Sequence, residues 1–253
     1  MILDLFRLDG RAALVTGGDK GLGQGMAIAL AQAGADIAIV SRSGRGEATL
    51  AAIEATGRRG VGFTADLSQP EAAPAVVEQT VQALGRIDIL VNNAGIIRRA
   101  DAAETELADF VAVLEVNLIG AWALAHAAGR RMLAQGSGKI INLASLLAFQ
   151  GGIRVPAYTA SKHAVAGLTK ALANEWAGRG INVNAIAPGY MATDNTQPLR
   201  DDPVRSRQLL ERIPAGRWGT PDDLAGAVVF LASRASDYVH GHILVVDGGW
   251  LAR

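Results

Sequence analysis

The sequence predicts a single doubly wound α/β domain, in which helices flank both faces of a parallel sheet. Short apolar runs alternate with helix-like segments along the whole chain. The runs are continuously apolar, which is typical of parallel strands buried on both faces. No low-complexity linker interrupts the 253 residues, and that length can bury one large core without a second domain. We therefore expect residues 1–253 to form one domain.

The expected elements alternate from one end of the chain to the other. Strands are expected at residues 12–16, 36–40, 61–65, 87–91, 139–143, 181–186 and 242–246. Helices are expected at residues 22–33, 46–56, 70–84, 108–134, 157–177 and 221–232. Gly34 and Gly57 follow the first two helices, and Pro70 begins the third, which are the positions that helix ends favour for these residues.

The composition excludes several classes of function. Lys+Arg and Asp+Glu number 24 each, so no global basic field would recruit nucleic acid or an anionic membrane. The absence of cysteine excludes disulfides, thiolate metal sites and a cysteine nucleophile, and the four histidines suggest no metal site. The N-terminus lacks the apolar core of a signal peptide, and no stretch approaches the roughly 20 apolar residues of a membrane span. We expect a soluble, cytoplasmic protein.

A glycine-rich loop follows the first expected strand and precedes the first helix. Thr16 to Gly23 read T-G-x-x-x-G-x-G. Glycines there let the chain turn sharply and let a diphosphate approach the helix N-terminus. Glycine also simply makes turns, but this position in a Rossmann-type domain is where dinucleotides bind. The candidate cofactor residues of the loop are Gly17, Lys20, Gly21, Leu22 and Gly23.

A second group of residues can carry proton chemistry. Ser145 follows an expected strand, at the edge where open α/β sheets bind ligands. Tyr158 and Lys162 are four residues apart and so share one face of a helix. A nearby ammonium favours the phenolate and could lower the tyrosine pKa from roughly 10 by up to about three units. Tyr158 could then act as a general acid/base. Each residue alone would more often be structural.

These motifs, in this order, resemble the short-chain dehydrogenase/reductase family along the whole chain. The resemblance implies that Tyr158 exchanges a proton with the substrate oxygen, that Ser145 holds this oxygen, and that Lys162 tunes Tyr158 and contacts the nicotinamide ribose. It implies that Asn117 supports a water chain to Lys162, and that the enzyme is a homotetramer, as family members commonly are. It further places Asp66, Leu67, Asn93, Ala94, Gly95, Tyr158, Lys162, Pro188, Gly189 and Thr193 at the cofactor.

The end of the second strand bears on the choice of nicotinamide cofactor. An acidic residue there would bind the ribose hydroxyl of NAD, but the chain has Ser41 and Arg42. Arg42 could pair with the 2′-phosphate of NADP. Lys20 resembles a second cation that NADP enzymes of this family often carry. Both could instead be solvated surface charges. We expect NADP(H), with NAD(H) as the alternative; Asp66 and Leu67 do not decide between them.

Arginines on the loops near the catalytic residues indicate an acidic substrate. An arginine fork matches a carboxylate, although any single arginine is more often a surface or subunit-contact residue. Residues 149–156, 187–195, 212–219 and 246–253 also resemble the sugar-acid dehydrogenase subgroup of the family, the 2-dehydro-3-deoxy-D-gluconate 5-dehydrogenases or 2-deoxy-D-gluconate 3-dehydrogenases. That subgroup often prefers NAD, from which Ser41 and Arg42 depart. In the family, the segment 190–220 covers the substrate. The candidate substrate residues are Arg98, Gln150, Arg154, Tyr190 and Arg217.

Other functions remain open at this point. One is an NADPH-dependent reductase of another ketone, of the keto-uronate or 3-oxoacyl type. An apolar substrate would favour an apolar covering segment, whereas residues 190–220 are rich in arginine. A cofactor-binding regulator without catalysis is the other, and it would favour a broken catalytic set. Ser145, Tyr158 and Lys162 are all present.

Overall fold

Seven parallel strands form one sheet in the computed structural model, which describes residues 1–44 and 46–253. The spatial order of the strands is β3-β2-β1-β4-β5-β6-β7. They are β1 (Ala12–Thr16), β2 (Asp36–Ser41), β3 (Gly60–Thr64), β4 (Ile89–Asn92), β5 (Gly138–Leu143), β6 (Ile181–Pro188) and β7 (Ile243–Val246). The doubly wound parallel fold and its strands are confirmed, with boundaries that differ from expectation by at most two residues.

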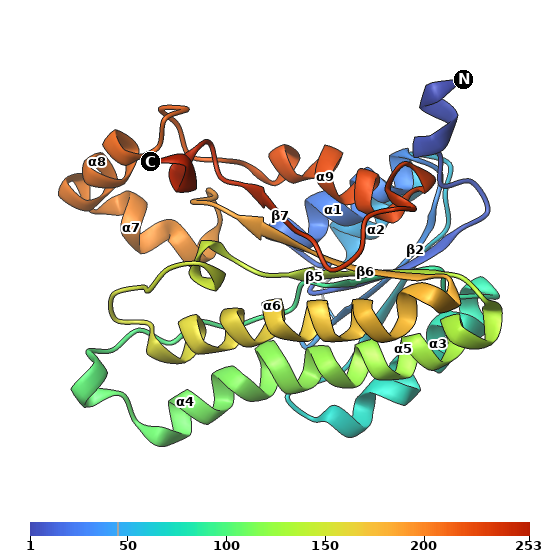
Figure 1. Cartoon of the computed structure of the whole chain (residues 1–253), viewed down its shortest axis with the longest axis horizontal. Helices are drawn as coiled ribbons and strands as arrows, with labels where there is room; N and C mark the ends of the chain where they lie inside the picture. The colour runs from blue at the N-terminus through green and yellow to red at the C-terminus, as the bar shows by residue number, and fades with distance from the viewer. Residues whose placement is uncertain (45) are drawn as a thin grey trace.

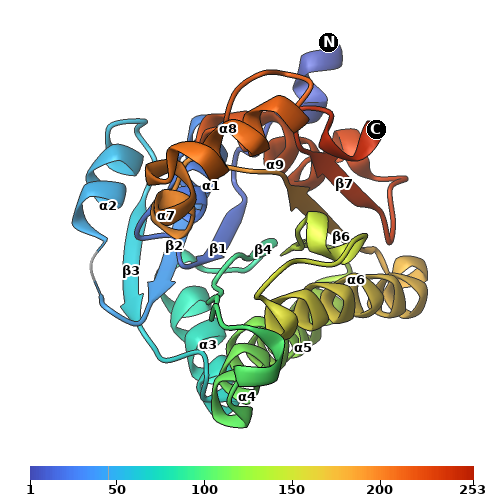
Figure 2. The same cartoon turned by 90° about the vertical axis from the view of Figure 1, so that its left-hand side faces the viewer.

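Helices cover both faces of the sheet (Figures 1 and 2). One layer holds α1 (Gly21–Gln32), α2 (Glu47–Glu54) and α9 (Ala225–Ala232). The other holds α3 (Ala73–Leu84), α4 (Leu107–Leu114), α5 (Ala121–Gln135) and α6 (Pro156–Trp176). Two shorter helices, α7 (Gln197–Asp201) and α8 (Pro203–Arg212), lie in the segment 190–220, outside these layers (Figure 1).

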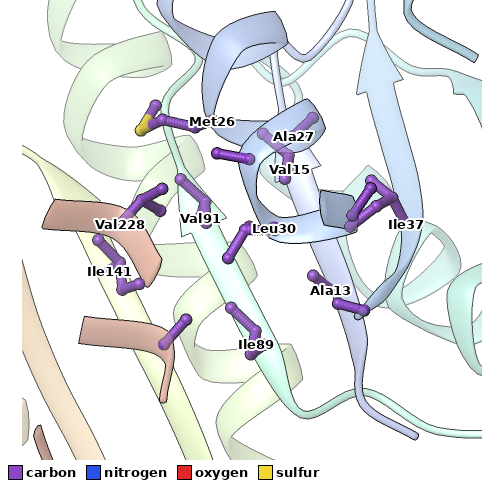
Figure 3. Packing of buried hydrophobic residues seen from close by; sticks show 14 of the residues in the cluster. Ala13, Val15, Met26, Ala27, Leu30, Ile37, Ile89, Val91, Ile141 and Val228 are labelled. Carbon is purple, nitrogen blue, oxygen red and sulfur yellow. The ribbon is translucent and has the colours of Figure 1, made fainter. Parts of the chain in front are cut away.

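The core lies on both sides of the sheet because successive strand residues point to opposite faces. In β1, Ala13 and Val15 join a cluster with α1 and α9, whereas Ala12 and Leu14 join a cluster with α3, α5 and α6. Figure 3 shows the first cluster, in which Leu30 of α1 lies between the strands and the helices. All five residues of β1 are buried. The continuously apolar sequence of β1 is therefore explained, as expected, by burial on both faces of the sheet.

The helix expected at residues 108–134 is interrupted by a π-helical turn. The helical run extends from Leu107 to Gln135, but Glu115–Gly120 form wider π turns between α4 and α5. This turn contains Asn117, which is buried, and π turns often occur at functional positions. Gly120 is required there, since a Cβ atom would lie 2.3 Å from the main-chain oxygen of Leu67. The uninterrupted helix predicted from periodicity was wrong at this point.

The same helical run corrects the expectation that no stretch approaches a membrane span. Leu107–Gln135 is long and apolar enough to cross a membrane by length and composition alone, with a mean hydropathy of 1.7 in its best window. Only 22% of that window is buried. One side of the run packs on α3 and α6, while Leu107, Val111 and Trp122 remain exposed. The helical run is therefore apolar on two faces. One face packs against α3 and α6, and the other is exposed.

Candidate active site

The candidate residues gather at the carboxyl edge of the sheet. The glycine loop follows β1, and the loops after β4, β5 and β6 lie at the same edge because the strands are parallel. The strand order reverses between β1 and β4, since consecutive strands are added on opposite sides of that pair. Doubly wound sheets bind ligands in the crevice at such a point.

The glycine loop has a shape that only glycine permits. Gly17 and Gly21 have φ values of +60° and +56°. A Cβ atom on Gly23 would lie 2.0 Å from the main-chain oxygen of Gly17. The loop leads into α1, whose N-cap residue, Lys20, makes no side-chain cap, so the first N–H groups of the helix are available to an anion. The loop therefore fits the diphosphate expected there.

Hydrogen bonds join the glycine loop to the loop after β4. The Thr16 hydroxyl accepts from the main-chain N–H groups of Asn93, at 2.9 Å, and Ala94, at 2.8 Å. The Asn93 amide in turn donates to the carbonyls of Thr16, at 2.8 Å, and Gly17, at 3.1 Å. Gly95 follows on the exposed surface. This network fixes Asn93 to Gly95 beside the glycine loop.

The end of β2 carries hydroxyls and a cation, as expected for NADP. Ser41 and Ser43 lie with their hydroxyl oxygens 3.5 Å apart, and Arg42 is exposed. Hydrogen bonds from Ser68 lower the pKa of Asp66, with a smaller contribution from the charge of Arg42. Leu67, which follows Asp66, is buried.

Lys20, the second expected phosphate ligand, makes an ion pair in this structure. Its ammonium lies 2.8 Å from the Asp194 carboxylate. Asp194 belongs to the segment 190–220, so the pair joins the glycine loop to that segment. Both side chains are exposed, and such pairs contribute little to stability. The fold therefore does not depend on this ion pair, and the Lys20 ammonium could bind a phosphate in place of the Asp194 carboxylate.

Residues after β6 bring a further part of the chain to the same edge. Pro188 ends β6, and Gly189 cannot carry a side chain, since a Cβ atom would lie 2.6 Å from the Cα of Asp247. The Thr193 methyl group would lie 3.9 Å from a Cβ atom on Gly21. The expected cofactor residues on the glycine loop and after β6 therefore face each other.

Tyr158 and Lys162 lie in the first two turns of α6, as expected. The Lys162 ammonium is 5.4 Å from the centre of the Tyr158 ring and donates to the main-chain oxygen of Leu143, at 2.5 Å. Lys162 is 5% exposed. The Ser145 hydroxyl follows β5 and accepts from the N–H of Leu147, at 3.2 Å. The fold thus brings Ser145, Tyr158 and Lys162 to one place.

The titration of Tyr158 differs from the expectation based on Lys162. Burial raises the pKa of the Tyr158 phenol, while the Ser145 hydroxyl and the charge of Arg99 lower it in part. Burial also lowers the pKa of Lys162 to about 8. The prediction that the Lys162 ammonium lowers the tyrosine pKa is therefore not met in the protein without its cofactor, because desolvation outweighs the favourable charges. A positively charged nicotinamide ring would supply the missing stabilisation of the phenolate, so the site fits the oxidised cofactor.

Asn117 is held within the protein by its amide group. Its oxygen accepts from the N–H of Ile96, at 2.8 Å, and its nitrogen donates to the Ile96 carbonyl, at 3.0 Å, and to the Ser161 hydroxyl, at 3.2 Å. Ser161 donates to the main-chain oxygen of Tyr158, at 2.7 Å. Sequence reasoning missed Ser161, although a serine three residues after Tyr158 shares its helical face. Asn117 and Ser161 thus connect the π turn to α6.

The three candidate substrate arginines all make ion pairs with carboxylates. Arg98 pairs with Asp109, at 3.5 Å, and Arg154 with Asp101, at 3.1 Å. Arg217 makes two bonds of 2.7 Å to Asp223. Arg154 also has a φ of +63°, which is uncommon for a residue with a side chain. A substrate carboxylate would have to compete with these internal partners.

The other two candidate substrate residues contact tryptophans that sequence reasoning missed. The Tyr190 ring lies 4.6 Å from the Trp250 ring and 5.8 Å from the Trp218 ring, measured between centres. The Trp250 indole N–H donates to the Gln150 side-chain oxygen, at 3.4 Å. These contacts connect residues distant in sequence, so no local pattern could reveal them.

Comparisons with known proteins identify the family. A family model described as Enoyl-(Acyl carrier protein) reductase matches residues 17–251. The 2-dehydro-3-deoxy-D-gluconate 5-dehydrogenase of Escherichia coli (strain K12) is 57% identical over the whole of both chains. A crystal structure from Agrobacterium tumefaciens with bound NADP is 55% identical, has a TM-score of 0.93, and covers 99% of this chain and 100% of its own.

A further solved structure is a gluconate 5-dehydrogenase from Burkholderia cenocepacia in complex with NADP and tartrate. It is 42% identical, has a TM-score of 0.96 and matches 100% of both chains. The full-length matches and the intact Ser145, Tyr158 and Lys162 lead to the same assignment. The chain belongs to the short-chain dehydrogenase/reductase family of oxidoreductases.

Proposed function

We propose that this enzyme transfers a hydride between NADP(H) and a hydroxyl or keto carbon of a deoxy sugar acid. The activity is of the 2-dehydro-3-deoxy-D-gluconate 5-dehydrogenase or 2-deoxy-D-gluconate 3-dehydrogenase type. The observation that carries the proposal is the proximity of Lys162 to Tyr158 at the carboxyl edge of the sheet, with Ser145 just after β5. The chain is 57% identical to such an enzyme from end to end.

The residues of the catalytic group have distinct roles. The nicotinamide, when bound, donates or accepts the hydride. Tyr158 exchanges a proton with the substrate oxygen, and the Ser145 hydroxyl holds that oxygen. Lys162, with a pKa of about 8, is mostly an ammonium at neutral pH and favours the Tyr158 phenolate. Asn117 holds the π turn against α6 and supports the path by which protons reach Lys162.

Residues at the carboxyl edge of β1 and β4 would hold the cofactor. The glycine loop and the N-terminus of α1 would hold its diphosphate. Arg42 and Lys20 would pair with the 2′-phosphate, and Ser41 could hydrogen-bond it. Two NADP-bound relatives support this preference, and NAD(H) is the alternative. The remaining cofactor contacts come from Asp66, Leu67, Asn93, Ala94, Gly95, Pro188, Gly189 and Thr193.

The substrate binds under the segment 190–220, in contact with residues of the surrounding loops. Tartrate, an acid, is bound to the Burkholderia relative, which supports an acidic substrate. Gln150 and Tyr190 offer polar groups whose orientation Trp250 restrains. The proposed substrate contacts are Arg98, Gln150, Arg154, Tyr190 and Arg217.

A panel of substrates with both cofactors tests the proposal. Absorbance of the reduced nicotinamide would be followed with sugar acids, keto-uronates, 3-oxoacyl thioesters and neutral lipophilic ketones. We expect the highest kcat/KM with a deoxy sugar acid and NADP(H). Activity confined to neutral lipophilic ketones would refute the sugar-acid assignment, and a strong preference for NAD would refute the cofactor.

The exposed side of the helical run supports a homotetramer. Leu107 and Val111 of α4 and Trp122 of α5 are 75%, 40% and 42% exposed, and such apolar patches mark contact surfaces. We propose a soluble, cytoplasmic enzyme without membrane or nucleic-acid partners, in which other copies of the same chain cover these residues. Sedimentation equilibrium should give four times the chain mass, and a monomer would contradict the assembly.

A further inference from the structure

Trp250, in the turn after β7, contacts three parts of the chain that are distant in sequence. Its ring centre lies 4.6 Å from that of Tyr190, just after β6, and 4.0 Å from the guanidinium carbon of Arg212, at the end of α8. Its indole N–H donates to the side-chain oxygen of Gln150, at 3.4 Å, in the loop after β5. Trp250 is 3% exposed. It therefore joins the loop after β5 to the segment 190–220.

Trp250 belongs to a small buried cluster that is separate from the two clusters on the faces of the sheet. The buried members of this cluster are Leu146, Leu209, Ile213 and Trp250. Two of them come from α8 and the residue that follows it, and Leu146 directly follows Ser145. Arg253 donates to the main-chain oxygens of the last two residues of α8, where the free carbonyls favour a cation. The indole is thus packed from several sides and has little freedom to turn.

The indole N–H determines which end of the Gln150 amide faces Trp250. An indole nitrogen only donates, so the group that faces it must be the amide oxygen. The amide nitrogen, with two N–H donors, then lies on the other side of the amide group. Within residues 1–44 and 46–253 this nitrogen has no hydrogen-bond partner, and Gln150 is half-buried. Two donors are therefore left for a ligand, five residues after Ser145.

We infer that Trp250 orients Gln150 so that Gln150 acts only as a hydrogen-bond donor to the substrate. The inference rests on the proposed sugar-acid activity, which supplies carboxylate and keto oxygens as acceptors. A glutamine amide without a fixed partner can rotate by half a turn and present its oxygen instead, so it would bind a hydroxyl donor as well. Trp250 is a positioning residue, because it acts through Gln150. The pair selects an acceptor oxygen at this place in the substrate.

The test is a double-mutant cycle of Trp250→Phe and Gln150→Met, assayed with 2-dehydro-3-deoxy-D-gluconate and saturating NADP. Phenylalanine keeps a ring in the cluster but lacks the N–H, so Gln150 is free to turn. We expect Trp250→Phe to raise KM for the acid by about 3- to 10-fold, the cost of immobilising one long side chain. The kcat and the KM for NADP should change less than about two-fold. In the Gln150→Met background, Trp250→Phe should change KM for the acid less than about two-fold.

Gln150→Glu tests the direction of the hydrogen bond. Glutamate keeps an acceptor for the indole and loses both donors, so KM for the acid should rise by more than about 10-fold. An unchanged KM in Gln150→Glu would show that Gln150 accepts from the substrate, and the inference would be refuted.

Trp176→Phe is the matched control for lost packing. Trp176 is 5% exposed and ends α6, roughly 27 Å along the helix from Tyr158, so its substitution should lower stability and leave all kinetic constants unchanged. An equal rise in KM for Trp250→Phe with and without Gln150 would reduce Trp250 to a packing role and overturn the inference. An unchanged KM in Trp250→Phe, in an enzyme that oxidises the acid, would overturn the inference alone. A wild type inactive on every sugar acid would overturn the proposed function as well.

Discussion

The two edges of the sheet both carry charged groups, but they differ in how their buried charges are balanced. At the amino edge the charges form internal pairs around a cavity of about 560 Å³. Asp88 is buried there and accepts from Arg11, Arg86 and the N–H of Ala12, at 3.1, 2.7 and 2.9 Å. Lys139 pairs with Asp237, at 2.8 Å. These groups satisfy one another without a ligand.

At the carboxyl edge some charges are also paired, but two of them have neutral partners. Lys162 donates to the carbonyl of Leu143, and Arg99 donates to the carbonyl of Asn195. Burial raises the pKa of Tyr158 and lowers the pKa of Lys162, so the protein alone disfavours the charged forms that catalysis needs. The comparison teaches that the paired charges at the amino edge stabilise the fold, whereas the buried charge of Lys162 at the carboxyl edge costs stability and serves catalysis.

The largest expected effect is on turnover, from removal of the Tyr158 hydroxyl. Tyr158→Phe should lower kcat by about 1,000-fold, since general acid–base catalysis contributes roughly 10²–10⁴. The midpoint of thermal unfolding should fall little, because the ring still fills its site. Tyr238→Phe, at a fully exposed tyrosine, is the matched control and should retain full activity. A Tyr158→Phe enzyme that keeps most of its kcat would place the proton chemistry elsewhere.

At the amino edge we expect a substitution to lower stability and leave turnover unchanged. Asp88→Asn leaves Arg11 and Arg86 without their shared buried carboxylate, and urea denaturation should show a loss of about 2–3 kcal/mol in the free energy of unfolding. The kcat and KM of the folded enzyme should stay within about two-fold. Asp9→Asn, at an exposed acid of the same edge, should change neither quantity measurably. Loss of activity without loss of stability in Asp88→Asn would remove the distinction between the edges.

A smaller effect is expected on cofactor choice at the end of β2. Arg42→Leu removes the proposed partner of the 2′-phosphate and should raise KM for NADP by about 10-fold. KM for NAD should change much less, because NAD lacks that phosphate, and it provides an internal control. Equal changes for both cofactors would assign Arg42 to another role.

The smallest effect concerns the ion pair between Lys20 and Asp194. Asp194→Asn frees the Lys20 ammonium from its exposed partner, and KM for NADP should fall by about two-fold at low salt. The difference from wild type should shrink as salt screens the pair. An increase in KM would show that Asp194 orders the cofactor site instead of competing for Lys20.

The sequence predicted most of the fold because its signals are local. Apolar runs located every strand, and the glycine pattern located the loop whose Gly23 permits no side chain. Local sequence patterns could not predict the π turn at Asn117, because this turn depends on the close approach of Gly120 to the Leu67 carbonyl. Periodicity alone cannot register such a tertiary contact.

The sequence predicted which residues form the candidate site better than it predicted their charges and pKa values. Tyr158 and Lys162 were identified by spacing, but the direction of the Tyr158 pKa depends on burial, which only the packed fold determines. The arginines were found by composition, whereas which of them is paired depends on Asp101, Asp109 and Asp223.

Lys162→Met provides the sharpest test, because the two edges predict opposite results for the loss of a buried charge. The folded pKa of Lys162, about 8, lies below the ordinary value of 10.5, so between these values the unfolded chain binds more protons. Wild-type stability should therefore gain a contribution from Lys162 as pH rises through that window, and the full cost of the buried ammonium is present below pH 8.

The measurement is the free energy of unfolding of wild type and Lys162→Met from pH 7 to pH 10, together with kcat at pH 7. We predict that the variant is more stable at pH 7 by about 2 kcal/mol, after the lost hydrogen bond to Leu143 is included. This advantage should shrink toward pH 10, and turnover should fall by about 100-fold. A variant that is less stable at pH 7, or that retains its turnover, would contradict the assignment of the carboxyl-edge charges to function.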